Sequence, residues 1–208
     1  AGKPPLSLAV LWYLVPDESH SKDGRHIEYL EQTEENLDKF RDCDPELYDK
    51  LGELVRTGVR RVSAVPEHNL LPPGTTYHDR RLDYSHVPRA ERPAVRESWL
   101  TSALQAAEGA DVVFLDPDNG LEVRQGPWDD LGPKYVFYDD LAWFSPAQTI
   151  VVYQHSARTA GVTFRMQLQD RMQELHRRLD RPREALFAMR WRRISARAFI
   201  FAAAAPHR

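Results

Sequence analysis

Cysteine is almost absent from this chain of 208 residues, because Cys43 is the only one. A single cysteine excludes an intrachain disulfide, and the scarcity favours a reducing compartment, so we expect a cytoplasmic protein. The chain also lacks any apolar run near the length of about 18 residues that a membrane helix needs. We therefore expect no membrane partner. These absences argue against disulfide-rich secreted proteins and membrane-spanning proteins.

Lysine is missing from the last part of the chain, although the total charge is nearly balanced. The formal net charge is −3, yet residues 151–208 hold 12 arginines, no lysine and 4 acids. The first 150 residues have the opposite excess, with 16 basic and 27 acidic residues. Such asymmetry is typical of a surface that faces RNA or DNA. It is equally typical of two parts of one fold that neutralise each other, and both interpretations stay open.

Alternating apolar and amphipathic segments predict the fold class. We expect strands at 7–15, 61–65, 76–79, 111–115 and 149–153, and helices at 27–41, 45–56, 91–108 and 164–179. The last two apolar segments, 185–191 and 196–203, predict an antiparallel hairpin. Strands that alternate with helices indicate a mostly parallel, Rossmann-like sheet with helices on both faces. The length fits a single α/β domain over residues 1–208.

The densest polar cluster follows one of these strands. Residues 112–122 read Val-Val-Phe-Leu-Asp-Pro-Asp-Asn-Gly-Leu-Glu, so the apolar run stops at Asp116, and Asp118 and Glu122 follow around an Asn-Gly turn. In an open α/β sheet, ligands bind beyond the carboxyl ends of the strands. A simple turn needs only one Asp and one Gly. Three acids and an amide therefore predict a functional site, with a helix cap or a tight turn as the structural alternative.

Histidines add two further candidates. His155 ends the strand after the central one and could face the same crevice as Asp116, where it would be a natural general base. The alternative is a histidine at a strand end that bonds to the backbone. His20 and His26 flank an acidic loop, but their spacing matches no standard metal signature. We predict no metal site there.

The order of these features resembles the bacterial ribosomal-RNA adenine N6-methyltransferases and their uncharacterised relatives. The resemblance is carried by the Leu115-Asp-Pro-Asp-Asn motif, by Val152-Tyr153 and by the terminal Ser195-Ala-Arg-Ala-Phe-Ile-Phe-Ala segment. A closing antiparallel pair of strands is the arrangement associated with class I methyltransferase folds. Where the family has Asp-Pro-Pro-Tyr, this chain has Asp118 and Asn119 in place of the second proline and of the aromatic that stacks on a flipped base. Another ring would have to replace that aromatic, and the candidates are Trp128, Tyr135 and Tyr138.

The resemblance implies S-adenosylmethionine as the cofactor and an amine of a nucleic acid or a nucleotide-like molecule as the substrate. The candidates for catalysis are Asp116, Pro117, Asn119 and His155. Asp116 and the Pro117 carbonyl would accept the hydrogens of the amine, since a proline adds no competing N–H. The candidates for cofactor binding are Asp17, Glu18, Asp23, Gly24 and Asp79. Asp79, or alternatively Asp83, would hold a pair of ribose hydroxyls.

Two other functions remain open. A metal-dependent nuclease or hydrolase would hold Mg²⁺ with Asp116, Asp118 and Glu122 and would use His155 as its base. A degenerate methyltransferase fold could instead persist as a nucleic-acid-binding protein without catalysis.

The arginine-rich segment generates a testable prediction. If Arg177, Arg178, Arg181, Arg183, Arg192, Arg193 and Arg197 line one surface, RNA and DNA binding should weaken steeply with salt, because each neutralised phosphate releases a counterion. About four such contacts give a log–log slope of about −3 to −4. Titration with short RNA and DNA at two salt concentrations measures this slope. No binding at low salt would leave the asymmetry as internal neutralisation.

Overall fold

The structure of the chain is a computed structural model that describes residues 5–16, 27–157, 161–191 and 196–204. The chain divides into two compact units. Unit 1 comprises Ala1–Pro16 and Gly74–Arg208, and unit 2 comprises Asp17–Pro73. Each unit is described by itself.

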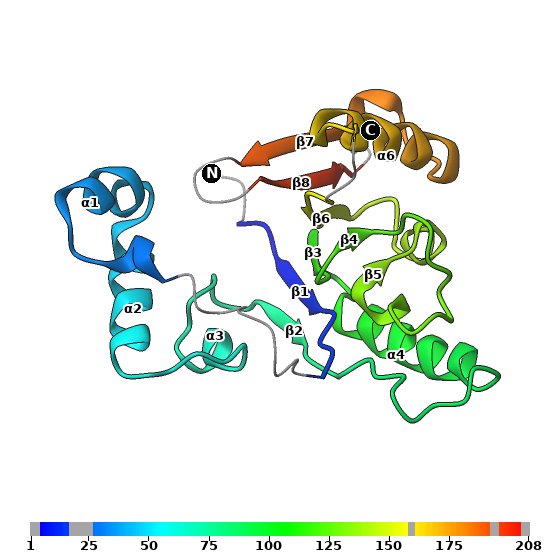
Figure 1. The fold of residues 1–208 in the computed structure, drawn as a ribbon, viewed down its shortest axis with the longest axis horizontal. Helices are drawn as coiled ribbons and strands as arrows, with labels where there is room; N and C mark the ends of the chain where they lie inside the picture. The colour runs from blue at the N-terminus through cyan, green and yellow to red at the C-terminus, as the bar shows by residue number, and fades with distance from the viewer. Residues whose placement is uncertain (1–4, 17–26, 158–160, 192–195, 205–208) are drawn as a thin grey trace. The chain divides into compact units, whose positions relative to one another are not determined.

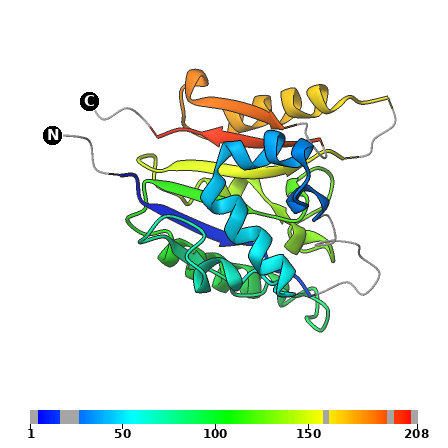
Figure 2. The same ribbon diagram turned by 90° about the vertical axis from the view of Figure 1, so that its left-hand side faces the viewer.

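A six-stranded, mostly parallel sheet forms the centre of unit 1 (Figure 1). Its strands are β1 (Leu8–Trp12), β2 (Thr76–His78), β3 (Val112–Asp116), β6 (Thr149–His155), β7 (Leu186–Trp191) and β8 (Arg197–Ala202). They lie in the order β2-β1-β3-β6-β8-β7, and Figure 2 shows the strands from β1 to β7 side by side. The first four run parallel, whereas β8 is antiparallel to both β6 and β7. The predicted α/β class and the antiparallel hairpin are confirmed.

Three helices of unit 1 pack against one face of this sheet. They are α4 (Arg92–Ala106), α5 (Tyr138–Leu141) and α6 (Phe164–Arg178). Trp99 from α4, Leu141 from α5 and Leu175 from α6 join strand residues such as Leu11 and Leu115 in one hydrophobic core. Within unit 1 the expected helical cover is found on this face. The longest helices have 15 residues, and none within the described ranges has both the length and the apolar character to cross a membrane.

A second, two-stranded parallel sheet lies in the connection between β3 and β6. It consists of β4 (Gly120–Leu121) and β5 (Tyr135–Val136), and the short helix η3 (Gly132–Lys134) leads into β5. Another short helix, η4 (Arg183–Ala185), precedes β7. The connection contains the Asp-Pro-Asp-Asn-Gly motif, so the small sheet helps to position that motif.

Arg96 ties α4 to this connection. Its side chain is 3% exposed and forms a buried ion pair with Asp140 of α5. It also donates to the carbonyls of Gly132 (3.3 Å) and Tyr135 (3.2 Å), and its guanidinium lies 4.6 Å from the centre of the Phe137 ring. A buried charge is tolerated when it is paired and most of its donors are bonded, as here, where only the Nε lacks a partner. The Arg96 side chain therefore holds three segments of the connection against α4, those at Gly132, Tyr135 and Asp140.

Unit 2 is helical. Its elements are η1 (Glu28–Leu30), α1 (Glu34–Phe40), η2 (Arg41–Cys43), α2 (Pro45–Arg56) and α3 (Ala64–Glu67). Asp44 caps α2, because its side chain accepts a hydrogen bond from the Leu47 amide at 3.0 Å. Pro45 occupies the first turn, where its missing N–H leaves no partner unsatisfied.

The strand predicted at 61–65 was wrong. The segment forms a turn that leads into α3, with the Ala64 amide bonded to the Arg61 carbonyl and the Val65 amide bonded to the Val62 carbonyl. These bonds span three residues and are local. A short apolar alternation does not distinguish a strand from a turn, and here the local hydrogen bonds determine the conformation.

The Arg96 ion pair allows a stability test. We expect Arg96→Ala to lower the free energy of unfolding by about 3–5 kcal/mol, because it leaves the Asp140 carboxylate buried without its partner. Arg89→Ala is the matched control, since Arg89 pairs with Asp129 while its side chain is 67% exposed. Its loss should change stability by about 1 kcal/mol or less. Urea unfolding measures both variants, and equal effects would contradict the assigned role of Arg96.

Candidate functional site

The carboxyl ends of β2, β1, β3 and β6 meet at one edge of the sheet because these strands are parallel. Trp12 of β1 is paired in register with Asp116 of β3. The chain passes from β1 to β2 on one side and then to β3 on the other. The edge between β1 and β3 is therefore a topological switch point, where open α/β sheets bind ligands.

Asp116 points away from the helical core. Its neighbour Leu115 is buried in the core, and successive side chains of a strand face opposite sides of the sheet. Leu115 is in register with Val152, so Tyr153 lies level with Asp116 on the same face. Asp116 thus lies between two aromatic residues on the neighbouring strands, Trp12 and Tyr153.

The structure places His155 on this face as well, two residues beyond Tyr153 on β6. The Tyr153 hydroxyl and His155 Nδ1 are 3.4 Å apart, and the His155 side chain is exposed. The role of His155 as a base for Asp116 stays a prediction. Among the described residues, the partner of the His155 ring is the Tyr153 hydroxyl and not a backbone group.

Burial changes the acidity of the Asp116 carboxyl. Its pKa is raised from 3.8 to about 6, mainly because burial disfavours the charged form and secondly because Asp118 is close. A carboxyl with this pKa exchanges its proton near neutral pH. Groups of this kind are suited to accept hydrogens from a substrate.

Gln154 holds the motif loop in position. The side chain is 1% exposed, and its Oε1 accepts from the Leu121 amide at 2.9 Å. Its Nε2 donates to the carbonyls of Asn119 (3.1 Å) and His155 (2.8 Å). Gly120 adopts φ = +107°, and a Cβ there would lie 2.5 Å from the Gln154 amide. Glycine is therefore required at this position, both for its backbone conformation and for the close approach.

The other two carboxylates of the motif have separate structural partners. Asp118 forms an ion pair with Lys134 at 2.9 Å. Glu122 accepts a hydrogen bond from the Tyr138 amide at 2.9 Å, and burial raises its pKa. No three His, Cys, Asp or Glu side chains form a metal-binding group anywhere in the described ranges. The carboxylates proposed for Mg²⁺ therefore do not converge.

Aromatic residues near the motif differ from those considered from sequence. The side chain of Asn119 lies close to the Tyr135 hydroxyl, and Tyr138 is a core residue of α5. The Trp128 carbonyl accepts a hydrogen bond from Arg92. The rings level with Asp116 are instead Trp12 and Tyr153. Sequence reasoning missed them and Gln154, although a glutamine within an apolar strand was a usable signal.

The expected cofactor residues are only partly placed. Asp79 directly follows β2, is exposed and lies at the same sheet edge, because Leu11 is in register with His78. Asp83 accepts a hydrogen bond from the Ser85 amide at 2.8 Å, as in a local turn. Asp17, Glu18, Asp23 and Gly24 lie outside the described residues. Asp79 is thus the one member of the set that can be tested against the geometry, and an exposed carboxylate beside the end of β1 fits a pair of ribose hydroxyls.

Several arginines of the C-terminal part already have partners within unit 1. Arg177 and Arg178 both pair with Glu174, and Arg178 also pairs with Asp139 at 2.8 Å. Arg181 donates to three backbone carbonyls, those of Ser145, Ala202 and Ala203. Arg192 and Arg193 lie outside the described residues. Internal pairing therefore accounts for Arg177 and Arg178, and a polyanion surface remains a proposal.

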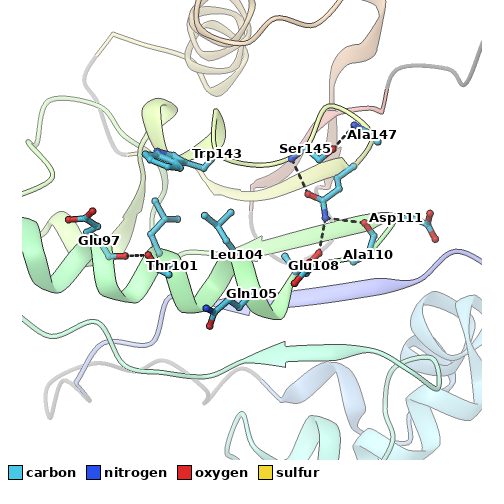
Figure 3. Close-up of a pocket in the computed structure, with 14 residues that line it drawn as sticks. Glu97, Thr101, Leu104, Gln105, Glu108, Ala110, Asp111, Trp143, Ser145 and Ala147 are labelled. Carbon is cyan, nitrogen blue, oxygen red and sulfur yellow. Dashed lines mark hydrogen bonds between the residues drawn. The ribbon is translucent and has the colours of Figure 1, made fainter.

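A large apolar cavity lies away from this edge. It has a volume of about 700 Å³ and lies between α4 and the segment 143–148, where Leu104 and Trp143 line it (Figure 3). Gln148 closes one side by donating to the carbonyls of Ala107 and Ala110. The cavity lies beside Asp111 at the amino end of β3, whereas Asp116 lies at the carboxyl end of that strand. We therefore do not assign the candidate site to this cavity.

Comparison with known proteins found no matching family model, no matching curated protein and no matching solved structure.

The raised pKa of Asp116 leads to a prediction on stability. A raised pKa means that the folded state favours the protonated carboxyl, so stability should fall as the pH rises from about 4 to about 6. The difference between 3.8 and about 6 corresponds to about 3 kcal/mol. Asp116→Asn should therefore unfold at higher urea than the wild type at pH 8, by up to that free energy.

The same comparison at pH 3.5 supplies the control condition, because the wild-type carboxyl is then protonated and the difference should nearly vanish. Asp118→Asn is the control variant, since Asp118 is exposed and paired only with Lys134. A stability difference of Asp116→Asn that did not change with pH would show that the carboxyl is not held in an unfavourable environment.

Proposed function

We propose that the chain is an S-adenosylmethionine-dependent methyltransferase that acts on an amine of a nucleic acid or of a nucleotide-like molecule. The observation that supports this most is the position of Asp116. It ends the strand beside the topological switch point, with a raised pKa and an aromatic residue on each side. This is where an α/β sheet binds nucleotide-like ligands.

The topology of the sheet also supports the proposal. The last strand, β8, lies between β6 and β7 and runs antiparallel to both. A closing antiparallel pair of this kind is the arrangement associated with class I methyltransferase folds. The finer assignment, a Rossmann-like methyltransferase fold, is part of the proposal.

Each of the residues at this edge of the sheet would have its own role. Asp116 and the carbonyl of Pro117 accept hydrogen bonds from the substrate amine and thereby orient its lone pair. Tyr153 offers a ring on which a base can stack, in place of the aromatic missing at Asn119, whereas the buried Trp12 already stacks on Tyr77. Asp79 holds the ribose hydroxyls of the cofactor. When bound, S-adenosylmethionine supplies a reactive methyl group on its sulfonium.

His155 has a distinct role in this scheme. Its ring lies beside the Tyr153 hydroxyl on the face of Asp116. A neutral imidazole there can receive the proton that the amine loses after methylation. The exposure of His155 lets that proton pass to water.

The hydrolase alternative receives less support, because Asp118 and Glu122 are bound to Lys134 and to the Tyr138 amide. A polyanion-binding protein without catalysis remains a second candidate through the exposed Arg165 and Arg183. Neither of these two arginines has an ion pair to a described residue, so both are available to phosphates.

Binding and activity can be tested together. We expect S-adenosylmethionine and S-adenosylhomocysteine to raise the melting temperature, as ligands of the folded state do, and Mg²⁺ alone to have no such effect. With methyl-labelled S-adenosylmethionine and RNA, DNA or free nucleotides as acceptors, Asp116→Ala should reduce methyl transfer by about 100-fold or more. The variant should remain folded, because Asp116 lies at a strand end and outside the hydrophobic core.

Asp118→Ala is the discriminating control. A methyltransferase should retain most of its activity, because the variant removes the exposed contact to Lys134 and only the smaller of the two causes that raise the Asp116 pKa. A Mg²⁺-dependent hydrolase would lose its activity in both variants. Failure of both S-adenosyl compounds to bind would overturn the proposal, and RNA binding without methyl transfer would favour the binding protein.

A further inference from the structure

Arg171 lacks the partner that a buried arginine normally has. It lies on the buried side of α6 and is 6% exposed. Its Nη1 donates to the Gln167 carbonyl of the preceding turn at 3.0 Å, while its Nε has no hydrogen-bond partner. No carboxylate among the described residues forms an ion pair with it. Buried arginines are rare unless they are paired, so this side chain needs an explanation.

Arg96 shows how the same fold satisfies a buried arginine that has only a structural role. That side chain has the Asp140 carboxylate, two backbone carbonyls and an aromatic ring around it. Arg171 has one carbonyl of its own helix. The Nε of each of these two arginines lacks a hydrogen-bond partner, but only Arg96 forms an ion pair with a described carboxylate. This difference indicates that the missing anion of Arg171 is supplied from outside the protein.

A cavity gives such an acceptor room to bind. It has a volume of about 660 Å³ and lies between α5, α6 and the loop at 122–125, with Arg171, Tyr135 and Tyr138 among its lining residues. Volumes of about 300–1,000 Å³ are typical of sites for small organic ligands. Tyrosine rings beside a guanidinium offer both apolar contact and hydroxyl donors.

Four of the other charged residues that line the cavity are already engaged, whereas Asp170 and Arg124 line it without an ion pair to a described residue. Arg177 and Arg178 pair with Glu174, and Glu122 accepts from the Tyr138 amide. Burial lowers the pKa of Arg171, although an arginine remains a cation at neutral pH. A buried cation without an anion destabilises the folded state. An anion that binds at Arg171 would remove this penalty. At Arg177 or Arg178 it would have to displace an existing ion pair.

We propose that the cavity between α5 and α6 binds the carboxylate or phosphate group of a small organic ligand, with Arg171 as the anchor. The guanidinium fork matches the two oxygens of a carboxylate or phosphate, and charge-assisted bonds of this type are among the strongest in proteins. The cavity lies on the helical side of the sheet, whereas Asp116 points to the other face. The site is therefore independent of the proposed methyl transfer.

Sodium phosphate and sodium succinate are the two probes for this site, compared with sodium chloride at equal ionic strength. We expect at least one of them to raise the melting temperature of the wild type and to give a measurable Kd by calorimetry. The better probe identifies the ligand group as a phosphate or a carboxylate. Arg171→Gln should weaken that binding by about tenfold or more, because a charge-assisted hydrogen bond is lost.

Arg165→Gln is the matched control, since Arg165 lies on the exposed side of the same helix. Its binding constant should equal that of the wild type. Without a probe, Arg171→Gln should be as stable as the wild type or more stable, because an unpaired buried charge is removed. A structural role would instead lower its melting temperature.

A measurement on the wild type keeps the proposal testable even if Arg171→Gln fails to fold. The Nε–H signal of Arg171 in ¹⁵N NMR spectra should shift as phosphate or succinate is added. No shift of that signal, together with no rise in melting temperature over chloride for either probe, would overturn the proposal. Binding of S-adenosylmethionine is a separate measurement at the other face, so the two proposals can fail independently.

Discussion

Parallel strands cannot be joined by a tight turn, and this constraint organises unit 1. β1 pairs in parallel with both β2 and β3, so each pairing requires a crossover segment. The crossover before β2 holds the whole of unit 2, the one before β3 holds α4, and the one before β6 holds the motif loop and α5. Because all these strands run the same way, their carboxyl ends meet at one edge. The candidate site exists because of this pairing.

Burial acts on three charged groups of unit 1 with three different outcomes. Arg96 is satisfied by Asp140 and by carbonyls, so its charge contributes to the fold. Asp116 forms no ion pair with a cation in the described part of the chain, and its pKa rises to about 6. Arg171 cannot lose its proton near neutral pH and keeps a donor without an acceptor. Asp116 and Arg171, the two of these groups without a described ion-pair partner, are those assigned to ligands, as expected where stability is given up for function.

The sequence predicts the central sheet well because its strands are continuous apolar runs. Residues 111–115 and 149–153 have few alternatives to a buried strand, and the apolar spacing of 164–179 gives α6 directly. The segment 61–65 fails because five residues with two valines fit a turn as well as a strand. Asp116 could be predicted as a site residue because three acidic residues stand close together at the end of a strand. Periodicity and local composition suffice for features of this kind.

Register and burial could not be predicted in the same way. Trp12 and Tyr153 become neighbours of Asp116 only through the pairing of β1 and β6 with β3. Gln154 gains its role from the close approach of Gly120, which is 34 residues earlier in the chain. Arg171 looked like one of many arginines in a basic segment, and its isolation depends on which side of α6 faces the core. Long-range contacts of this type leave no local pattern.

The motif loop connects the two faces of unit 1. It begins at Asp116, which points away from the helices, and it ends at Glu122, which lines the cavity of Arg171. Gln154 fixes the middle of this loop through bonds to Asn119 and Leu121. The side chain of Asn119 lies close to the hydroxyl of Tyr135, a second lining residue of the cavity. The loop from Asp116 to Glu122 therefore contributes to both faces, while each proposed site keeps its own charged anchor, Asp116 on one face and Arg171 on the other.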